Sequence, residues 1–435
     1  MRIYDKYHGY IELCDVAVSI IDTPIFQRLR NIKQTGVVYL VFPTASHSRF
    51  EHSIGTYYLA NEMISKIKNK QPELGITDEI IMLVSIAGLC HDLGHLMFSH
   101  LFDDYFVPKI TNIEINLSHE ERSIFLLNHI VNKYKINLNI SQLKVISDLI
   151  IPKKSEYSKW NSKYKIGKWI FQIISNPINS IDVDKFDYLI RDTDALGFKL
   201  SFDYSRIMND AKVINEKICY SSQCSNDIYY MFFIRYRLHR QVYNHKAVKA
   251  IEILIIKILF ELEEKLKISE YLLDVDKMMK LVDPFILLND SNLINDIYER
   301  KLPKMVYQDI TITPSTFDDT KLKKAFNENS YEIMKFKVGY VSSKNNPLNN
   351  ITFYNLKTGT IINENKFKNF SLLINHKHQE YFLRVYCKDL LLLDKFKIFF
   401  NNKTETTINN TNLDNLDNLD NLDNLDNLDN IDSLD

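Results

Sequence analysis

The sequence predicts a mainly α-helical protein with a smaller α+β lobe at its C-terminal end, and three observations support this fold class. Apolar residues recur with helical spacing through much of residues 1–265. Residues 266–400 mix helical patterns with short runs typical of strands. The chain of 435 residues is 45% apolar and 25% charged, which suffices for a large buried core and excludes a disordered or collagen-like protein.

Individual elements follow from caps and periodicity. A helix is expected to begin at Thr23-Pro24, because Thr is a favourable N-cap and Pro suits the first helical turn. Thr77 is expected to cap the apolar run that ends at Cys90. Two further helical patterns cover residues 181–196 and 229–264. The predicted strands are residues 333–340, 351–355 and 383–387, with a turn at 344–347.

The sequence gives no indication of secretion or of a membrane span. The longest apolar runs, such as residues 80–90, are too short to cross a bilayer, and the first twenty residues lack the pattern of a signal peptide. The five cysteines are odd in number and show no paired spacing, so we expect reduced thiols. We therefore expect an intracellular protein, cytoplasmic or nuclear, that has no membrane partner.

Residues 401–435 are predicted to form a disordered, low-complexity tail in which Asn-Leu-Asp repeats from Asn412 onward. Leucine at every third position matches neither a helical nor a strand face, so the repeat cannot offset its ordering entropy. We favour a neutral expansion of the repeat over an acidic interaction tail. The repeat carries eight Asp and no basic residue, so a net charge of −1 for the chain leaves +7 for the rest. A basic body suits a triphosphate or a nucleic acid without choosing between them.

The chemistry is concentrated in residues 90–100, Cys-His-Asp-Leu-Gly-His-Leu-Met-Phe-Ser-His. The adjacent pair His91 and Asp92 ends a helix so apolar that we expect it to be buried, where polar groups cost free energy unless paired or metal-bound. His91 and His95 are four residues apart and would share one face of a helix. Nitrogen and oxygen donors side by side suit a divalent cation. A lone His-Asp pair is weak evidence, since a surface pair or a capped helix end gives the same pattern.

Two distant segments offer the remaining ligands. His52 lies 39 residues before His91, and Asp184 lies 92 residues after Asp92. A His, an adjacent His-Asp pair and a distant Asp, in this chain order, resemble the metal quartet of the HD phosphohydrolase superfamily. Two imidazoles and two carboxylates accept Fe, Mn, Zn, Ni or Mg, so the ligand types do not identify the divalent metal.

Further motifs make the resemblance more specific. The chain is similar to the SAM-and-HD-domain deoxynucleoside triphosphate triphosphohydrolase family at residues 22–52, 91–100, 118–120, 181–192 and 235–246, and more weakly at 346–347, 352–354 and 384–387. No segment matches the SAM domain of the family, and the repeat tail is extra. The resemblance implies an HD-domain helical bundle over residues 1–265 and an α+β lobe over residues 266–400. It also implies hydrolysis of a deoxynucleoside triphosphate to deoxynucleoside and inorganic triphosphate.

The resemblance assigns catalytic roles residue by residue. The metal would be held by His52, His91, Asp92 and Asp184. His95 and His119 would contact the phosphates, together with a Mg ion that accompanies the nucleotide. His100 would protonate the departing 5′-oxygen, a role that suits an imidazole because its pKa lies near neutrality. Asp103 would orient His100.

The same resemblance assigns the substrate site. The triphosphate would be neutralised by Arg49, Lys185 and Arg235, since Arg can bind two oxygens at once. The sugar site would be lined by Gln34, Tyr188, Asp192 and Tyr243. Asp192 would accept the 3′-hydroxyl, and a Tyr would exclude a ribose 2′-oxygen. Tyr188 and Tyr243 also have helical spacing among apolar residues, so packing in the core is an open alternative for both.

Regulation follows from the same comparison. The family assembles as tetramers activated by nucleotides bound between subunits, which implies a homo-oligomer, dimer or tetramer, with GTP or dGTP as activator. The matching allosteric positions are Asp22, Gln27, Arg30, Arg206, Lys246, Arg300 and Lys304. Two basic positions of the second site fall on Ser221 and Gln223, and an N-terminal Lys falls on Met1. An alternative therefore stays open, in which the seven matching residues are ordinary surface residues that bind no nucleotide.

Two other functions remain open from the sequence. One is another HD-superfamily phosphohydrolase that acts on a nucleoside monophosphate or an alarmone, although Arg49, Lys185 and Arg235 favour a longer phosphate chain. The other is a single-stranded nucleic-acid-binding protein, or weak nucleic-acid binding beside the enzyme activity, which the basic body would allow. No Gly-rich, Lys-rich or aromatic-basic stretch supports that class.

Overall fold

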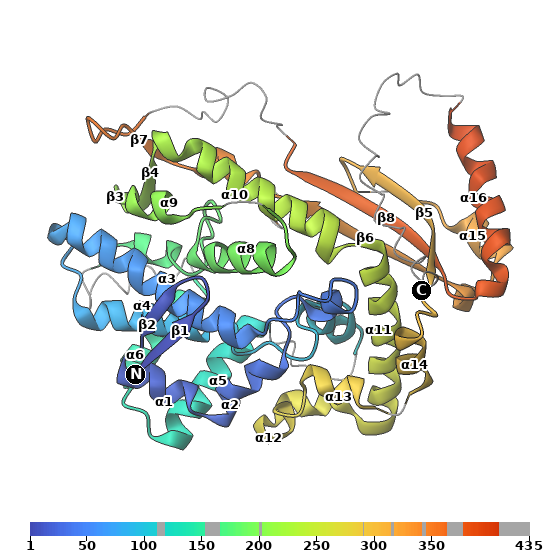
Figure 1. Ribbon diagram of the computed structural model, residues 1–435, viewed down its shortest axis with the longest axis horizontal. Helices are drawn as coiled ribbons and strands as arrows, with labels where there is room; N and C mark the ends of the chain where they lie inside the picture. The colour runs from blue at the N-terminus through green and yellow to red at the C-terminus, as the bar shows by residue number, and fades with distance from the viewer. Residues whose placement is uncertain are drawn as a thin grey trace, which may run out of the picture.

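The computed structural model describes residues 1–408 apart from 111–117, 153–165, 200–201, 290, 315–316, 342–344 and 363–376, and for 402–408 it describes the backbone alone. Most of the N-terminal body is helical (Figure 1). Its long helices are α3 (Arg49–Lys70), α4 (Asp78–Cys90), α5 (His119–Tyr134), α6 (Ile140–Ile150), α8 (Val183–Ala195), α10 (Ser225–Leu238) and α11 (Lys246–Leu266). The mainly α-helical fold predicted from the sequence is confirmed.

Shorter helices fill the remainder of the chain. They are α1 (Asp15–Ile21), α2 (Pro24–Gln27), α9 (Ser205–Asn209), α12 (Val275–Met278), α13 (Asp283–Leu287), α14 (Asn292–Tyr298), α15 (Thr320–Ala325) and α16 (Leu393–Ile408). Two π-helical turns cover residues 102–106 and 239–243. Such turns occur often at functional sites.

The helix starts agree with the predicted caps. The side chain of Thr77 accepts a hydrogen bond from the backbone N–H of Ile80, and Thr23 does the same for Phe26. The single helical pattern at residues 229–264 is divided between α10 and α11. The division falls at His245, whose side chain accepts from the N–H of Ala247 and so begins a new helix.

The described residues form three small sheets beside the helices. Strands β1 (Arg2–Asp5) and β2 (Gly9–Glu12) form an antiparallel hairpin within the region that was predicted to be mainly helical. Strands β3 (Lys212–Ile214), β4 (Lys217–Ser221) and β7 (Phe353–Tyr354) form a second sheet. Strands β5 (Lys304–Thr311), β8 (Gln379–Cys387) and β6 (Tyr331–Gly339) form an antiparallel third sheet in that order.

The predicted strands at residues 333–340, 351–355 and 383–387 coincide with β6, β7 and β8, whereas β5 was not predicted. The predicted turn at 344–347 begins outside the described residues. Strand β7 pairs in parallel with β4, with Phe353 opposite Tyr220. Because of this pairing, the C-terminal part of the chain returns to the helical body.

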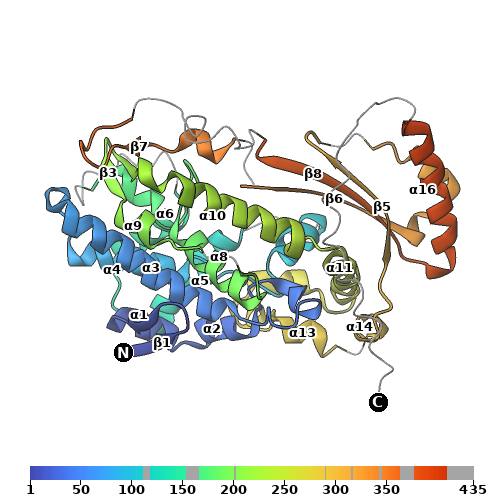
Figure 2. The same ribbon diagram turned by 45° about the horizontal axis from the view of Figure 1, so that its top comes forward.

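The described residues form two hydrophobic cores. The larger core joins the helices of the N-terminal body and includes buried residues of the C-terminal part as far as Tyr386, well beyond the predicted domain boundary near residue 265. The smaller core lies between the β5–β8–β6 sheet and α16, on the far side of α11 from the bundle (Figure 2). Phe396 and Phe400, one turn apart on α16, are buried in it.

The tail was predicted to begin at residue 401, but α16 continues to Ile408. The Asn-Leu-Asp repeat lies outside the described residues. Within the part of the chain that the structure describes, no helix is long and apolar enough to cross a membrane. All five cysteines are free thiols, as expected.

Candidate metal centre and phosphate site

Four predicted metal ligands converge where α3, α4 and α8 meet. His52 Nε2 lies 3.1 Å from an oxygen of Asp184 and 3.6 Å from an oxygen of Asp92. His91 Nε2 lies 3.5 Å from Asp184 and 3.4 Å from Asp92. Both Nε2 atoms are buried without a hydrogen-bond partner among the described residues. Two unpartnered imidazole nitrogens facing two carboxylates fit a divalent cation, since such a cation would satisfy all four groups.

The other ring nitrogen of each imidazole has a defined partner. His52 Nδ1 lies 2.8 Å from Oδ2 of Asp187, and His91 Nδ1 lies 2.8 Å from the carbonyl oxygen of Gly88. An ionised carboxylate and a carbonyl can only accept, so Nδ1 carries the hydrogen in both rings. In the neutral form of each ring, Nε2 is then the nitrogen with a free lone pair, which is the arrangement that hydrogen-bond partners of Nδ1 give to metal-binding histidines.

The electrostatics of the quartet favour a positive charge at its centre. Burial lowers the pKa of His52, but the carboxylates of Asp184 and Asp187 raise it to about 10. Burial raises the pKa of Asp184, yet its contacts with His52 and His91 hold that pKa well below its usual value. The pKa of Asp92 is also low, because His91 and Arg49 outweigh its burial.

His91 and His95 do not share a helical face, contrary to the sequence prediction. Helix α4 ends at Cys90, so His91 is its C-cap residue and the chain turns before His95. His95 Nε2 instead lies 3.4 Å from Asp92, and its ring stacks on His119 with 4.1 Å between centroids. Asp92, His95 and His119 offer donor atoms within 4.8 Å of one another. They form a second group that could hold a cation, beside the quartet.

His100 completes a cluster of three imidazoles. Its ring centroid lies 5.1 Å from that of His95 and 5.7 Å from that of His119. The side chain keeps access to solvent, but the surrounding protein lowers the pKa of His100, and His119 and Arg49 act in the same direction. His100 is therefore an exposed imidazole beside the two candidate cation positions.

The turn before His100 is held in an unusual conformation. Phe98 and Ser99 have φ values of 54° and 55°, in the left-handed region that residues with side chains seldom adopt. The N–H of Phe98 donates to Oδ1 of Asp283 at 2.7 Å, and the N–H of Lys33 donates to Oδ2 at 2.8 Å. Asp283 therefore fixes the turn that carries His100 and the segment that carries Gln34.

Asp103 contacts other partners than the one assigned to it. Arg122 donates to one oxygen of Asp103, and the second oxygen lies 3.6 Å from His95 Nδ1 and 3.9 Å from His119 Nδ1. No hydrogen bond or ion pair joins Asp103 to His100 among the described residues, although the two charges interact. Orientation of His100 by Asp103 therefore stays a prediction.

The three predicted phosphate-binding cations lie in the same region. Arg49 is buried and donates to Asp92 and, at 2.7 Å, to Ser99 Oγ. Lys185 Nζ lies 3.0 Å from Asp182, which also caps α8. Arg235 donates from Nη1 to the carbonyl of Gly339 at 2.7 Å, while its buried Nε has no hydrogen-bond partner among the described residues. Arg235 therefore has a donor available for a ligand.

The predicted sugar residues also come together. One oxygen of Asp192 lies 2.7 Å from His47 Nε2, and the other accepts from the hydroxyl of Tyr243. Burial and the nearby Asp192 raise the pKa of Tyr243 well above its usual value. Within the described part of the chain, the buried Oε1 of Gln34 has no hydrogen-bond partner, so this oxygen is available to a ligand. Tyr188 is half-buried against the larger core. This position is compatible with lining the sugar site and with packing in the core.

Four residues near the site were not identified from the sequence. His47 contacts Asp192, Asp187 contacts His52, and Arg122 contacts Asp103. The fourth is His239, whose ring packs against Tyr243 at 4.9 Å and whose pKa is lowered by burial and Arg235. His239 could have been found from the sequence, because it follows Arg235 by one helical turn and would share a helical face with it.

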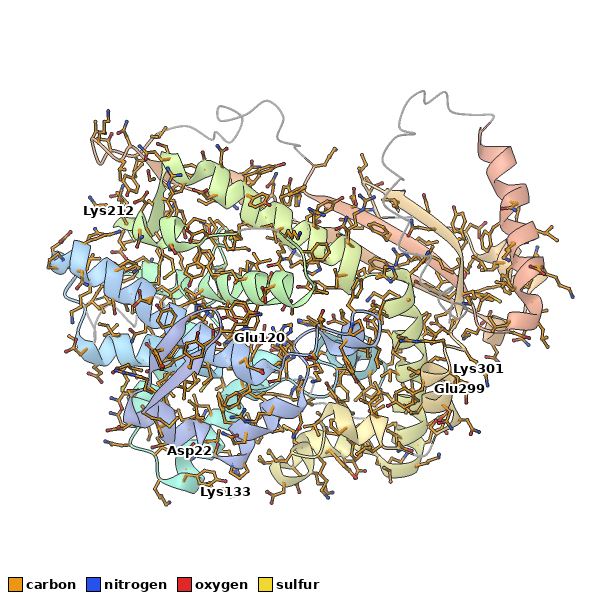
Figure 3. The ribbon with its side chains drawn as sticks, in the orientation of Figure 1. Asp22, Glu120, Lys133, Lys212, Glu299 and Lys301 are labelled. Carbon is orange, nitrogen blue, oxygen red and sulfur yellow. The ribbon has the colours of Figure 1, made fainter. Side chains whose placement is uncertain are left out.

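The predicted allosteric residues lie at the surface in separate places. Arg30 donates to Gln27 at 2.7 Å and lies 3.5 Å above the ring of Phe50, and Asp22 is exposed beside them. Figure 3 places Asp22 and the segment from Glu299 to Lys301 on opposite sides of the molecule. Asp22 and Arg300 therefore do not form one site within one chain. The side chains of Asp22, Arg30, Arg206, Lys246, Arg300 and Lys304 are exposed, and Gln27 is half-buried.

The fold and the site define this chain as an HD-domain protein, and residues 49–190, which contain the whole quartet, match the HD domain family. The chain is 36% identical over 405 residues to the deoxynucleoside triphosphate triphosphohydrolase SAMHD1 homolog of Dictyostelium discoideum, covering 89% of this chain and 77% of that protein. It is 35% identical over 448 residues to an HD domain-containing protein of Acanthamoeba polyphaga mimivirus, covering 91% and 94%. It is 34% identical over 444 residues to Homo sapiens SAMHD1, covering 89% and 70%. The chain belongs to the SAMHD1 family of HD-domain proteins.

Proposed function

We propose that this protein hydrolyses deoxynucleoside triphosphates to the deoxynucleoside and inorganic triphosphate. The observation that carries the proposal is the meeting of His52, His91, Asp92 and Asp184 beside the imidazoles of His95, His100 and His119. The relatives named deoxynucleoside triphosphate triphosphohydrolases support this choice of substrate and reaction.

A divalent metal fits the close group of His52, His91 and Asp184, with Asp92 3.4 Å from His91 and 3.6 Å from His52. A Mg ion accompanying the nucleotide fits Asp92, His95 and His119. When bound, the metal would supply Lewis acidity to a phosphate oxygen and to the attacking water. Fe, Mn, Zn, Ni and Mg all suit two imidazoles and two carboxylates. Elemental analysis of the purified protein would identify the metal that it retains.

The protein's own residues bind the triphosphate and supply the proton. Arg49, Lys185 and Arg235 bring three positive charges to the phosphate chain. Hydrolysis adds the elements of water across the bond between the α-phosphorus and the 5′-oxygen, and His100 gives its proton to that oxygen. The negative charge of the bound triphosphate raises the pKa of His100 and so keeps the proton in place until the bond breaks.

The sugar site selects a deoxyribose with a free 3′-hydroxyl. Asp192 is buried between His47 and Tyr243, and its carboxylate accepts the 3′-hydroxyl. A substrate that lacks this hydroxyl leaves Asp192 less well paired, so the site rejects it. Tyr188 lies one helical turn before Asp192 and excludes a 2′-hydroxyl by its volume.

The test is chromatography of the products from a mixed nucleotide panel, with Mg and Mn supplied. We expect dNTPs to be consumed in strong preference to rNTPs, with intact triphosphate released. Equal turnover of rNTPs, or orthophosphate as the main product, would overturn the substrate assignment. Turnover of monophosphates alone would favour another HD phosphohydrolase. Salt-sensitive binding of single-stranded DNA without turnover would favour the nucleic-acid-binding alternative.

We further propose a homo-oligomer whose activity rises with GTP or dGTP. The surface around Asp22, Gln27 and Arg30 supports a nucleotide site completed by Arg300 and Lys304 of another copy, because these groups lie apart within one chain. Ser221 is fully buried, which weakens the case for the second nucleotide site. Sedimentation and turnover should both change on adding GTP or dGTP, and unchanged mass and rate would remove this part of the proposal.

An intracellular setting is proposed from the thiols. Four of the five free cysteines are buried, and none is paired. Unpaired thiols persist in reducing compartments. Cell fractionation with a tagged chain would test this location, and recovery from the culture medium would contradict it.

A further inference from the structure

The carboxylate of Asp187 lies behind the metal quartet and is bound on both oxygens. Oδ2 accepts from His52 Nδ1 at 2.8 Å and from Arg191 Nε at 3.0 Å. Oδ1 accepts from His8 Nε2 at 2.7 Å and from Arg191 Nη2 at 2.8 Å. His8, His52 and Asp187 have side chains that are at most 1% exposed. Four donors therefore fix the carboxylate that in turn fixes His52.

His8 reaches this position from the turn of the β1–β2 hairpin, which points toward α8 in Figure 1. Oδ1 of Asp5 accepts from the N–H of Tyr7 at 2.8 Å and from the N–H of His8 at 3.1 Å, and so shapes the turn. Gly9 follows with a φ of 69°, a conformation that favours glycine. The other oxygen of Asp5 lies 3.1 Å from Arg191 Nη1.

The ring of His8 is held on its remaining sides as well. Its Nδ1 lies 3.1 Å from the hydroxyl of Tyr204, and its ring stacks on Tyr58 with 5.0 Å between centroids. The carboxylate of Asp187 can only accept, so Nε2 of His8 carries the hydrogen and Nδ1 accepts from Tyr204. His8 therefore has one orientation available to it and presents one donor to Asp187.

We propose that His8 is a positioning residue for the metal ligand His52, and that it acts through Asp187 to hold the His52 ring with Nε2 toward the metal. The hairpin is thereby part of the support of the metal centre, although it contributes no ligand. Groups that hydrogen-bond to a metal-binding imidazole, as Asp187 does to His52, orient the ring and tune its affinity for the metal. This inference rests on the metal site of the proposed function.

The same hairpin provides a matched control. Lys6 and Tyr7 anchor the turn to Asp194, with 2.9 Å between the Tyr7 hydroxyl and a carboxylate oxygen. Asp194 lies two turns further along α8 than Asp187 and has no described contact with the quartet. Loss of these anchors loosens the hairpin without removing the donor to Asp187.

The experiment measures Mn²⁺ binding to metal-free full-length protein by EPR titration, together with circular dichroism as a check of folding. We expect His8→Ala to weaken Mn²⁺ binding by about 10-fold. This is the lower end of the loss of about 10- to 100-fold that follows removal of a group hydrogen-bonded directly to a metal ligand, since His8 acts one contact further away. His8→Gln, which restores a donor at about the reach of Nε2, should recover most of the affinity. Lys6→Ala and Tyr7→Phe should bind Mn²⁺ like the wild type.

A double-mutant cycle with Asp187→Asn tests the route. If His8 acts through Asp187, the losses of Mn²⁺ affinity in His8→Ala and Asp187→Asn do not add. His8→Phe keeps the ring on Tyr58 and serves in place of His8→Ala if the alanine variant does not fold. Unchanged affinity in a folded His8→Phe or His8→Ala chain, or an equal loss in Lys6→Ala, would overturn the inference. If the wild-type chain bound no Mn²⁺, the inference would be overturned for Mn²⁺. If that same chain lost turnover when His91 was substituted, the proposed function would still stand.

Discussion

Arg122 donates to the carboxylate of Asp103 and directs its second oxygen toward the imidazoles of His95 and His119. Arg122 also donates from Nε to the carbonyl of Gly94 at 2.9 Å, so it links Asp103 to the turn that follows Asp92, the proposed metal ligand. Burial raises the pKa of Asp103, and Arg122 opposes that rise. Asp103 therefore places a carboxylate oxygen beside His95 and His119, within ion-pair distance of both rings.

His100→Ala should lower kcat by about 10²- to 10⁴-fold, because it removes the proton donor for the 5′-oxygen. Nucleotide binding should be largely kept, as measured by equilibrium dialysis with a dNTP. Asp103→Asn should cause a smaller loss, since it changes the surroundings of the proton donor and leaves the donor in place. If dNTP binding disappeared while bound substrate still turned over, His100 would be a binding residue.

His91→Ala or Asp92→Ala should abolish hydrolysis while leaving a folded chain. Each removes one of four ligands, and the donor atoms that remain no longer complete the site. The metal content, measured by elemental analysis after gel filtration, should fall with the activity. Full activity in either variant with an unchanged metal content would refute the quartet.

The quartet could be predicted from the sequence because its four residue types and their chain order are distinctive. Helix α4 could also be predicted, since Thr77 and a long apolar run mark its two ends. The relative orientation of the His91 and His95 side chains could not be predicted. Both residues follow the last turn of α4, so the helical spacing that the prediction used does not apply to them.

The contact of the β1–β2 hairpin with the candidate metal site could not be predicted from the sequence. Strands β1 and β2 have four residues each, too few for alternation to distinguish them from other short segments. Asp187, the partner of His8, is 179 residues away along the chain. Nothing near His8 in the sequence records a contact at that separation, so only the fold could pair them.

Truncation of the chain at Asn410 should leave the rate of hydrolysis unchanged. The Asn-Leu-Asp repeat fits no amphipathic element, and the described site residues all lie before α16. Steady-state kinetics of the truncated and full-length chains, with and without GTP, would check this. A large drop in the rate would show that the acidic repeat acts on the site or on assembly.

Asp283 should make the stability of the fold depend on pH in an unusual direction. Burial raises its pKa to about 6 in the folded chain, against about 3.8 for the ordinary group, although the N–H groups of Lys33 and Phe98 oppose the rise. A carboxyl group whose pKa is raised by folding contributes stability below pH 4, and that stability is lost as the pH rises through 6. The loss amounts to about 3 kcal/mol.

Urea unfolding of the wild type and of Asp283→Asn across pH 4 to 7 isolates this contribution, since every other group titrates in both chains. The free energy of unfolding of the wild type, relative to the variant, should be greatest near pH 4 and should decline toward pH 7. A constant difference would show that Asp283 keeps an ordinary pKa in the folded chain.

Gly55→Ala should destabilise the protein, although the substitution lies in the middle of α3. In an exposed helix this change would raise the free energy of unfolding by about 1 kcal/mol. Here a β-carbon would lie 1.8 Å from Oδ1 of Asp187 and 2.6 Å from Nη2 of Arg191, so the carboxylate that holds His52 has to move. Overpacking of this kind costs about 1–3 kcal/mol, which outweighs the gain in helix propensity. Denaturant unfolding and Mn²⁺ titration should therefore both show a loss, whereas Ser65→Ala on the same helix should show neither. A gain in stability with unchanged Mn²⁺ affinity would mean that Asp187 can move without disturbing the metal centre.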